Sequence, residues 1–244
     1  MNKRAALFLA TVALLAIPGT GEAQINYLEV QSAPEPSHLV DIVVEAGTYT
    51  PSFYRGRAEP VPGGPLKLIA IVRDSGTLDN KSLLYYWNVD GQPINAGKPS
   101  SESIELRAPN KNEFLVRLEV TGENGTLVAE RSEIIGLSKP FVVFYEVNPL
   151  RGLSRIAVGD TLLVTAEEAT IEVSPYFLDT ISGPAYLNWS VNGTPVATGS
   201  DNPYQLVLSR SGLSSIPVTI SFYAASRETI GLTAEGQLKA TQGL

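Results

Sequence analysis

Hydrophobic and polar residues alternate with a period of two in several short segments of this chain. In residues 114–120 every second residue is apolar, whereas Arg117 and Glu119 fall on the opposite face. This alternation is typical of a β-strand that buries one of its faces. Further strand-like segments lie at 66–72, 83–89, 169–173 and 186–191, and turn-forming residues separate them at 60–65 and 109–112. Many short strands divided by Gly, Pro and Asn turns predict an all-β sandwich fold.

The chain also contains an internal repeat at an offset of 102 residues. Residues 87–94 (WNVDGQPI) match residues 189–196 (WSVNGTPV), and these two segments contain the only two tryptophans. The same offset places the apolar set of 114–120 on 216–222, and the strand-like segment 39–45 on 141–147. A repeat of this length is typical of one β-sandwich domain and far longer than a solenoid unit. The simplest interpretation is a duplicated domain.

Each copy of the repeat contains a turn dipeptide between two apolar segments. Asp90-Gly91 in the first copy and Asn192-Gly193 in the second follow the tryptophan closely. Such pairs favour a type I′ turn, in which both central residues need a positive φ, and they predict a β-hairpin in each copy.

The N-terminus has the pattern of a signal peptide. Lys3 and Arg4 precede an apolar run at 5–17, and small residues lead to a predicted cleavage site before Gln24. The alternative is a retained membrane anchor, but this run of 13 residues is shorter than the roughly 20 that a membrane-spanning helix needs. We therefore expect an extracytoplasmic protein that is secreted, periplasmic or on the cell surface, with no membrane span after cleavage.

The residues around each tryptophan resemble a known family. The tripeptides that end in Trp87 (YYW) and Trp189 (LNW) precede a hairpin turn and, later, an alternating apolar strand. This arrangement is similar to strands C to F of immunoglobulin-like domains and resembles PKD-type domains most. The resemblance implies that each tryptophan is a central core residue between two sheets. The chain departs from the PKD pattern, because no acidic residue and Gly-Asp-Gly turn follow the tryptophan directly.

Two other segments resemble a narrower group. Residues 49–58 (YTPSFYRGRA) and 144–152 (FYEVNPLRG) look like parts of uncharacterised secreted Ig/PKD-like proteins from uncultured small-genome bacteria. That group has no established activity, so the resemblance implies export and fold but no chemistry. In each segment a Pro and an Arg-Gly follow the first strand. We interpret this as a chain that leaves one sheet edge to cross to the other.

The repeat and the resemblance together predict the fold class and the domains. The fold class is all-β, with two tandem immunoglobulin-like (PKD-like) β-sandwich domains after an N-terminal signal peptide. The predicted parts are a signal peptide at 1–23, an extended lead-in at 24–37, a first sandwich domain at 38–137 and a second at 138–241.

Charge and cysteine content narrow the partners and the origin. The formal net charge is −7 and there is no cysteine. An acidic chain lacks the basic patches that nucleic acids and anionic membrane surfaces require, so we expect neither as a partner. Without disulfides, each domain must be held by core packing alone, which fits a bacterial exported protein best.

Few residues offer catalytic or metal-binding chemistry. The single histidine, His38, follows a Pro-rich lead-in, and no Gly-x-Ser-x-Gly motif accompanies it. One histidine and no cysteine exclude zinc. Calcium is possible, although no EF-hand spacing supports it. The loop residues with suitable oxygen atoms are Asp74, Asp79, Asn80, Glu167, Glu168 and Asp179. We predict no enzyme activity and no cofactor.

Aromatic residues are the remaining candidates for ligand contacts. Phe53 and Tyr54 follow the first strand, and Tyr204, like Tyr176 and Phe177, lies in or near a loop. Loops on a rigid sandwich are where binding residues usually lie; the alternative is that these rings plug the open ends of the sandwich.

The leading hypothesis is a non-enzymatic surface or periplasmic protein that mediates protein–protein interaction or cell-surface assembly. The alternatives are a carbohydrate-binding (adhesion) module and a hydrolase with an unrecognised loop site. The expected partner is a protein or glycan of the cell envelope, and the oligomeric state is open.

Overall fold

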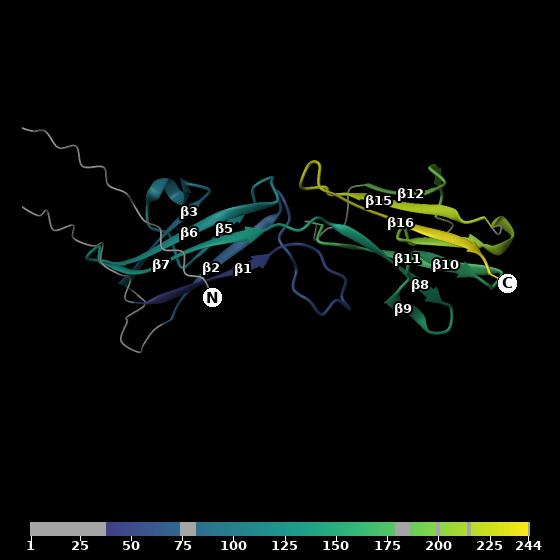
Figure 1. The fold of residues 1–244 in the computed structure, drawn as a ribbon, viewed down its shortest axis with the longest axis horizontal. Helices are drawn as coiled ribbons and strands as arrows, with labels where there is room; N and C mark the ends of the chain where they lie inside the picture. Colours follow the sequence, from purple (N-terminus) through teal and green to yellow (C-terminus); the bar gives the residue numbers. More distant parts are fainter. Residues whose placement is uncertain (1–37, 74–81, 179–185, 199–200, 214–215, 244) are drawn as a thin grey trace, which may run out of the picture. The chain divides into compact units, whose positions relative to one another are not determined.

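The computed structural model describes residues 38–73, 82–178, 186–198, 201–213 and 216–243, and it shows an all-β chain (Figure 1). The predicted signal peptide, the lead-in and Asp74, Asp79, Asn80 and Asp179 lie outside these residues. Residues Glu35–Leu244 form one compact unit. Within the described ranges, no helix has the length and apolar character needed to cross a membrane.

The first half of the described chain forms two antiparallel sheets around one hydrophobic core, and we call it the first sandwich. Its sheets have the strand orders β1-β2-β5 and β4-β3-β6-β7. The strands are β1 (Leu39–Ala46), β2 (Pro65–Arg73), β3 (Leu83–Val89), β4 (Gln92–Pro93), β5 (Ser103–Arg107), β6 (Glu113–Gly122) and β7 (Leu127–Gly136). A 3₁₀ turn at Ile94–Gly97 follows β4.

The second half forms another pair of sheets around its own core, and we call it the second sandwich. Its sheets have the orders β14-β11-β8-β9 and β10-β16-β15-β12-β13, and β10 runs parallel to β16. The strands are β8 (Phe141–Asn148), β9 (Gly152–Ala157), β10 (Thr161–Val164), β11 (Glu168–Tyr176), β12 (Tyr186–Val191), β13 (Thr194–Val196), β14 (Gln205–Ser209), β15 (Val218–Ala225) and β16 (Thr233–Gln242). A 3₁₀ turn at Arg210–Gly212 lies between β14 and β15.

The two tryptophans occupy equivalent core positions, as the resemblance implies. Trp87 and Trp189 are each only 2% exposed and belong to separate hydrophobic clusters. The indole N–H of Trp87 donates to the carbonyl oxygen of Ser101 at 3.2 Å, and that of Trp189 donates to Pro203 at 2.9 Å. The two acceptors are themselves 102 residues apart, so the duplication extends to this hydrogen bond.

The hairpin turns have the backbone that the dipeptides predict. Asp90 and Gly91 have φ of 51° and 82°, and Asn192 and Gly193 have φ of 48° and 80°. These positive values are those of a type I′ turn. The side-chain oxygen of the first turn residue also accepts a backbone N–H from the neighbouring strand, from Leu115 in one copy and Thr219 in the other.

The repeat offset is not constant, which corrects one part of the sequence alignment. Trp87 lies opposite Leu118, and Trp189 lies opposite Phe222, so β6 and β15 correspond at an offset of 104. The expectation that 216–222 matches 114–120 is therefore wrong by two residues. Two additional residues between β14 and β15 cause the shift, and Ile216 is 75% exposed rather than buried. Because two residues preserve the alternation of a strand, the apolar pattern remained in phase and concealed the insertion.

Candidate functional site

The segment that follows β1 contacts the second sandwich before the chain reaches β2. The backbone N–H of Tyr49 donates to Leu178 at 2.6 Å, and the carbonyl oxygen of Tyr49 accepts from Phe177 at 2.8 Å. Val61 is fully buried and belongs to the hydrophobic core of the second sandwich. The interpretation of residues 49–58 as a simple crossing between two sheet edges is therefore incomplete. The other segment of this kind, 144–152, behaves differently, because it comprises the end of β8, the turn at 149–151 and the first residue of β9.

Phe53 and Tyr54, two of the three predicted ligand-contact residues, lie in this segment and pack against other aromatic rings. The ring of Phe53 meets Tyr145 edge-on at a centroid distance of 5.3 Å, and Tyr54 meets Tyr176 in the same way at 5.4 Å. Tyr145 and Tyr176 come from β8 and β11, and both are buried. Since Phe144 and Val173 point into the core, Tyr145 lies on the outer face of this sheet, which the segment covers.

The two tyrosine hydroxyls of this cluster are hydrogen-bonded to each other. The Oη atoms of Tyr145 and Tyr176 are 2.7 Å apart, and Phe141 stacks on Tyr176 with its ring centroid 5.0 Å away. Burial, and then the hydrogen bond to Tyr145, raise the pKa of Tyr176 well above its ordinary value. The neutral phenol is therefore the form that the fold favours.

This cluster predicts a loss of stability in alkali. A tyrosine whose pKa is higher in the folded than in the unfolded chain stabilises the fold below its unfolded pKa of about 10, and this contribution is lost as the pH rises further. We expect the free energy of unfolding to fall above about pH 10, and the fall to be shallower in Tyr176→Phe. Urea unfolding followed by circular dichroism at several alkaline pH values measures both.

Some alkaline dependence should remain in that variant, because burial also raises the pKa of Tyr49, Tyr85 and Tyr204. Equal slopes in Tyr176→Phe and the unchanged chain would contradict the assignment of the effect to Tyr176.

Tyr204, the third predicted contact residue, lies at the margin of the second core. It is partly buried, and its ring lies 6.5 Å from that of Phe222. Burial raises the pKa of Tyr204, and the neighbouring Tyr49 adds to this shift. The structure thus shows packing roles for Phe53, Tyr54 and Tyr204, and a ligand contact by any of them stays a prediction.

The other residues considered for chemistry lie apart from this cluster. The backbone N–H of His38 donates to the carbonyl oxygen of Val128 at 3.0 Å, at the start of β1. Glu167 and Glu168 border a shallow depression together with Arg210. Among the residues that the structure describes, no three His, Cys, Asp or Glu side chains are grouped so that they could hold a metal ion.

The outer edge of β1 differs between the two copies of the repeat. In the second sandwich, β9 pairs antiparallel with the corresponding edge of β8, with Tyr145 opposite Ala157. No strand in the described part of the chain pairs with this edge of β1. The difference arises from the segment that follows the first strand of each copy. In the first copy this segment, 47–64, contacts the second sandwich, whereas in the second copy the equivalent residues form β9 and β10. Along Leu39–Ala46 this edge of β1 therefore has no paired strand among the described residues, although β7 lies beside it and is hydrogen-bonded to His38 just before β1.

Hydrogen-bond parity identifies the backbone groups on this edge. The N–H of Gly47 donates to Pro65, so Gly47 bonds toward β2. Antiparallel bonding alternates along a strand, and the odd-numbered residues of β1 therefore face β2 while Ile42 and Val44 face outward. The carbonyl oxygen of Phe144, the counterpart of Ile42, accepts a hydrogen bond from Val158 just after β9. This edge can thus accept an added strand.

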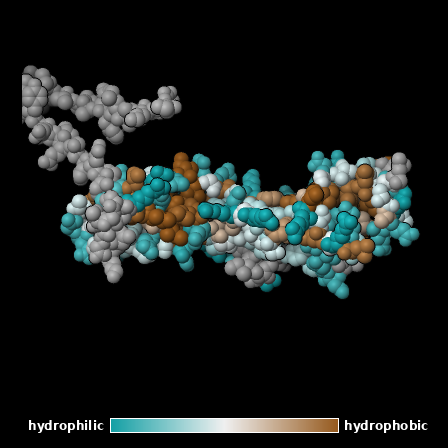
Figure 2. All heavy atoms as spheres, turned by 90° about the horizontal axis from the view of Figure 1, so that it is seen from below, coloured by the Kyte–Doolittle hydropathy of each residue, from teal (hydrophilic) through white to brown (hydrophobic). Residues whose placement is uncertain are grey.

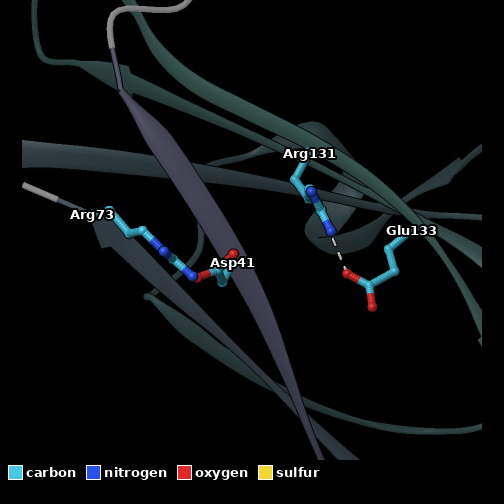
Figure 3. Close-up of polar contacts among 4 residues, drawn as sticks. All are labelled: Asp41, Arg73, Arg131 and Glu133. Atoms are coloured by element: carbon cyan, nitrogen blue, oxygen red, sulfur yellow. Dashed lines mark hydrogen bonds and ion pairs between the residues drawn. The ribbon is translucent and has the colours of Figure 1, made fainter. Parts of the chain in front are cut away.

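The surroundings of the β1 edge are mainly apolar, and the strand itself has two charged residues, Asp41 and Glu45. Leu39 is 71% and Ile71 49% exposed, on β1 and the adjoining β2. Figure 2 shows a hydrophobic area in the half where Figure 1 places these two strands. Asp41 is paired with Arg73 across the two strands at 2.6 Å. Figure 3 shows this pair near a second one on β7, where Arg131 and Glu133 are 3.5 Å apart.

Two of these features, the aromatic cluster at Tyr145 and the unpaired edge of β1, were not predicted from the sequence. Tyr145 gave a signal that could have been used, because it is an aromatic residue on the strand face opposite to Phe144 and therefore needs a covering segment. The open edge of β1 gave none, since strand pairing between the two copies is a tertiary property that alternation does not reveal.

The comparisons with known proteins show little about this chain. No protein-family model matches the sequence, and no curated protein matches it. Among solved structures it is similar to the fibronectin(III)-like modules of CbhA from Clostridium thermocellum, with 11% identity over 83% of this chain and 95% of that one and a TM-score of 0.27. It is also similar to Sidekick-1 immunoglobulin domains 1–4, with 11% identity, coverages of 83% and 74% and a TM-score of 0.28. A third is SGBP-B of the Bacteroides ovatus mixed-linkage glucan utilization locus, in complex with a mixed-linkage heptasaccharide, with 11% identity, coverages of 82% and 70% and a TM-score of 0.26. Similarities this low carry no information about what this chain binds.

Proposed function

We propose that this chain is a non-enzymatic, extracytoplasmic assembly protein that binds a second copy of itself through the free edge of β1. The signal-peptide pattern at 1–23 supports export, and the sequence offers no recognisable catalytic motif. The units of the proposal are the two predicted domains, at 38–137 and 138–241. The observation that supports it is the edge of β1, with which no strand of the described residues pairs, whereas β9 pairs with this edge in the other copy of the repeat.

The choice of β1 over β7 rests on charge. Both are edge strands of the first sandwich. Charged side chains on an edge oppose the addition of another strand, and β7 has three, in Glu130, Arg131 and Glu133, all of them in ion pairs, whereas β1 has two. In β1 Asp41 is paired with Arg73, Glu45 is exposed, and the other six residues are apolar. A second strand therefore meets less opposition at β1.

A second copy of β1 fits this edge by symmetry. Two identical strands can pair antiparallel about a two-fold axis, which gives a closed, self-complementary interface. If Ile42 pairs with Ile42 of the second copy, Asp41 lies opposite Val43 and Leu39 lies opposite Glu45. No two acids face each other in this register, so no like-charge repulsion opposes it. The pairing joins the two three-stranded sheets into one of six strands.

Blocking the edge is expected to abolish self-association. In Val44→Pro the outward-facing N–H is removed while the bonds of β1 to β2 remain. Sedimentation velocity of residues 24–244, over a range of concentrations, should show a monomer–dimer equilibrium for the unchanged chain and a monomer for this variant. Val44→Thr keeps the backbone N–H and the β-branched shape and should still dimerise.

A second variant guards against misfolding of the proline variant. Val43→Glu places an acid opposite Asp41 of the second copy without altering any backbone group, and the like-charge repulsion should also give a monomer. Circular dichroism verifies that both variants are folded. A chain that stays monomeric at all concentrations, or dimers that persist in both variants, would show that the proposal is wrong.

A further inference from the structure

The second sandwich has a polar face on three neighbouring strands, remote in sequence from β1. Trp189, Phe222 and Leu238 of β12, β15 and β16 point into the core. The residues that flank them in sequence therefore point outward. These outward residues border a depression of about 340 Å³, and they are Asn188, Ser190, Ser221, Tyr223, Glu235 and Gln237.

The register of the strands brings these side chains into two rows across the sheet. Asn188 lies opposite Tyr223, which in turn lies opposite Glu235. Ser190 lies opposite Ser221, and Ser221 lies opposite Gln237. Directly opposed residues on one sheet face are close enough to contact the same small ligand. The face thus combines two amides, two hydroxyls, one carboxylate and one aromatic ring at the depression.

The equivalent face of the first sandwich serves as an internal comparison. At the offset of 104 that applies to β15, Ser221 and Tyr223 replace Arg117 and Glu119. Arg117 forms an exposed ion pair with Glu130 at 3.5 Å on that face. Charged side chains are sufficient to keep a sheet face in water, as the first copy illustrates. Where the first copy has Arg117, Glu119 and Glu130, this face has the single charge of Glu235, a composition that solvent exposure alone does not require.

Tyr223, which borders the depression, contacts a second tyrosine. The rings of Tyr186 and Tyr223 have centroids 6.1 Å apart and planes inclined at 64°. Tyr186 is 56% exposed. Because the two rings meet edge to face, the pair is held in place without either ring being covered, and an aromatic face remains open to a ligand. Rigid aromatic rings of this kind are common anchors in binding sites.

We propose that this face of β12, β15 and β16 binds a neutral saccharide. A sugar ring has C–H groups on its faces and hydroxyls around its rim. The tyrosine rings match the former, and the amides, hydroxyls and carboxylate match the latter. Glu235 would repel acidic sugars, which favours a neutral ligand. The volume lies at the lower end of the roughly 300–1,000 Å³ of small-molecule sites and fits a short stretch of a glycan chain. This site goes beyond the self-assembly at β1 and is independent of it.

The proposal is tested by calorimetric titration of residues 24–244 with cellohexaose, xylohexaose and mannohexaose. We expect saturable binding of at least one of the three. Tyr223→Ala should weaken that binding by about tenfold or more, because it removes the ring and leaves the neighbouring polar groups in place. Tyr223→Phe retains the ring and should bind within about threefold of the unchanged chain.

Matched variants separate this site from the rest of the surface. Gln237→Ala should weaken binding, whereas Ser132→Ala, at the equivalent position of the first sandwich, should leave it unchanged. Self-association through β1 does not enter the readout if Val43→Glu, which opposes Asp41 of the second copy, is used as the background. The proposal is overturned if none of the three hexasaccharides binds, or if Tyr223→Ala binds as tightly as the unchanged chain.

Discussion

Replacing Trp87 with alanine is expected to destabilise both sandwiches, whereas replacing Trp189 is expected to destabilise the second sandwich alone. Each indole is almost completely buried and donates a hydrogen bond to a backbone carbonyl. Truncating such a residue costs about 3–5 kcal/mol, a large share of the roughly 5–15 kcal/mol that stabilises a typical domain. Each substitution should therefore unfold its own sandwich or come close to doing so.

The asymmetry follows from residues 47–64. This segment is anchored at both ends in the first sandwich, by β1 and β2, yet Val61 is part of the second core and Tyr54 packs against it. If the first sandwich unfolds, the segment loses both anchors. Ordering it on the second sandwich then costs more conformational entropy than in the folded chain. The second sandwich then loses part of this packing. No segment of the second sandwich enters the core cluster of the first among the described residues.

The chain has only two tryptophans, so each variant retains one fluorescent reporter, in the other sandwich. In Trp87→Ala, the unfolding of the second sandwich is followed through Trp189 in a urea titration. Trp87→Phe is the control, since it removes the reporter but keeps most of the buried volume. We expect a lower midpoint for Trp189 in the alanine variant than in the phenylalanine control. Coincident midpoints would mean that the second sandwich does not depend on the first.

The elements of this fold that arise from local signals could be predicted from the sequence. The Asp90-Gly91 turn was predictable because its positive φ values depend on two adjacent residues. The core position of Trp87 was implied by the resemblance of its neighbouring residues to immunoglobulin-like domains, in which this tryptophan packs between two sheets. The all-β class follows from many such segments together.

Features that depend on the pairing of distant segments could not be predicted in this way. The two-residue insertion before β15 preserves strand alternation, so a fixed offset matched Leu118 to the wrong partner without disturbing the pattern. The course of residues 47–64 was equally hidden. Their similarity to the β8–β9 segment suggested a similar path, but hydrogen bonds from Tyr49 to residues of the second sandwich determine the path instead.

For the candidate sites, the sequence indicated only that aromatic residues could serve as ligand contacts. Phe53 and Tyr54 were selected as possible ligand contacts, and in the structure their rings contact rings of the second sandwich. The face with Tyr223 was visible in the alternation of 218–223, yet nothing in one strand indicates which residues lie beside it on β12 and β16. The duplication is the more useful guide, because the copies differ at the β1 edge and at this polar face. A position is a candidate for function when one copy has residues that solubility alone explains and the other copy has different residues there.

Replacing Tyr54 with alanine is expected to lower the stability of the second sandwich, although Tyr54 belongs to the connection between two strands of the first. Its ring contacts Tyr176 at 5.4 Å and Phe177 at 6.0 Å between centroids. Aromatic pairs contribute about 0.5–1.5 kcal/mol each beyond the area they bury, and a partly buried ring adds a hydrophobic contribution of similar size. We therefore expect a loss of roughly 2–3 kcal/mol.

The effect should appear in the transition of Trp189 in a Trp87→Phe background and be smaller in the transition of Trp87 in a Trp189→Phe background. Tyr54→Phe retains both ring contacts and should be close to the unchanged chain. Arg55→Ala, an exposed neighbour in the same segment, controls for disturbance of the backbone. If Tyr54→Ala shifts the Trp87 transition and not that of Trp189, the ring stabilises the first sandwich instead. The dependence of the second sandwich on the first would then rest on Val61 and the backbone hydrogen bonds of Tyr49.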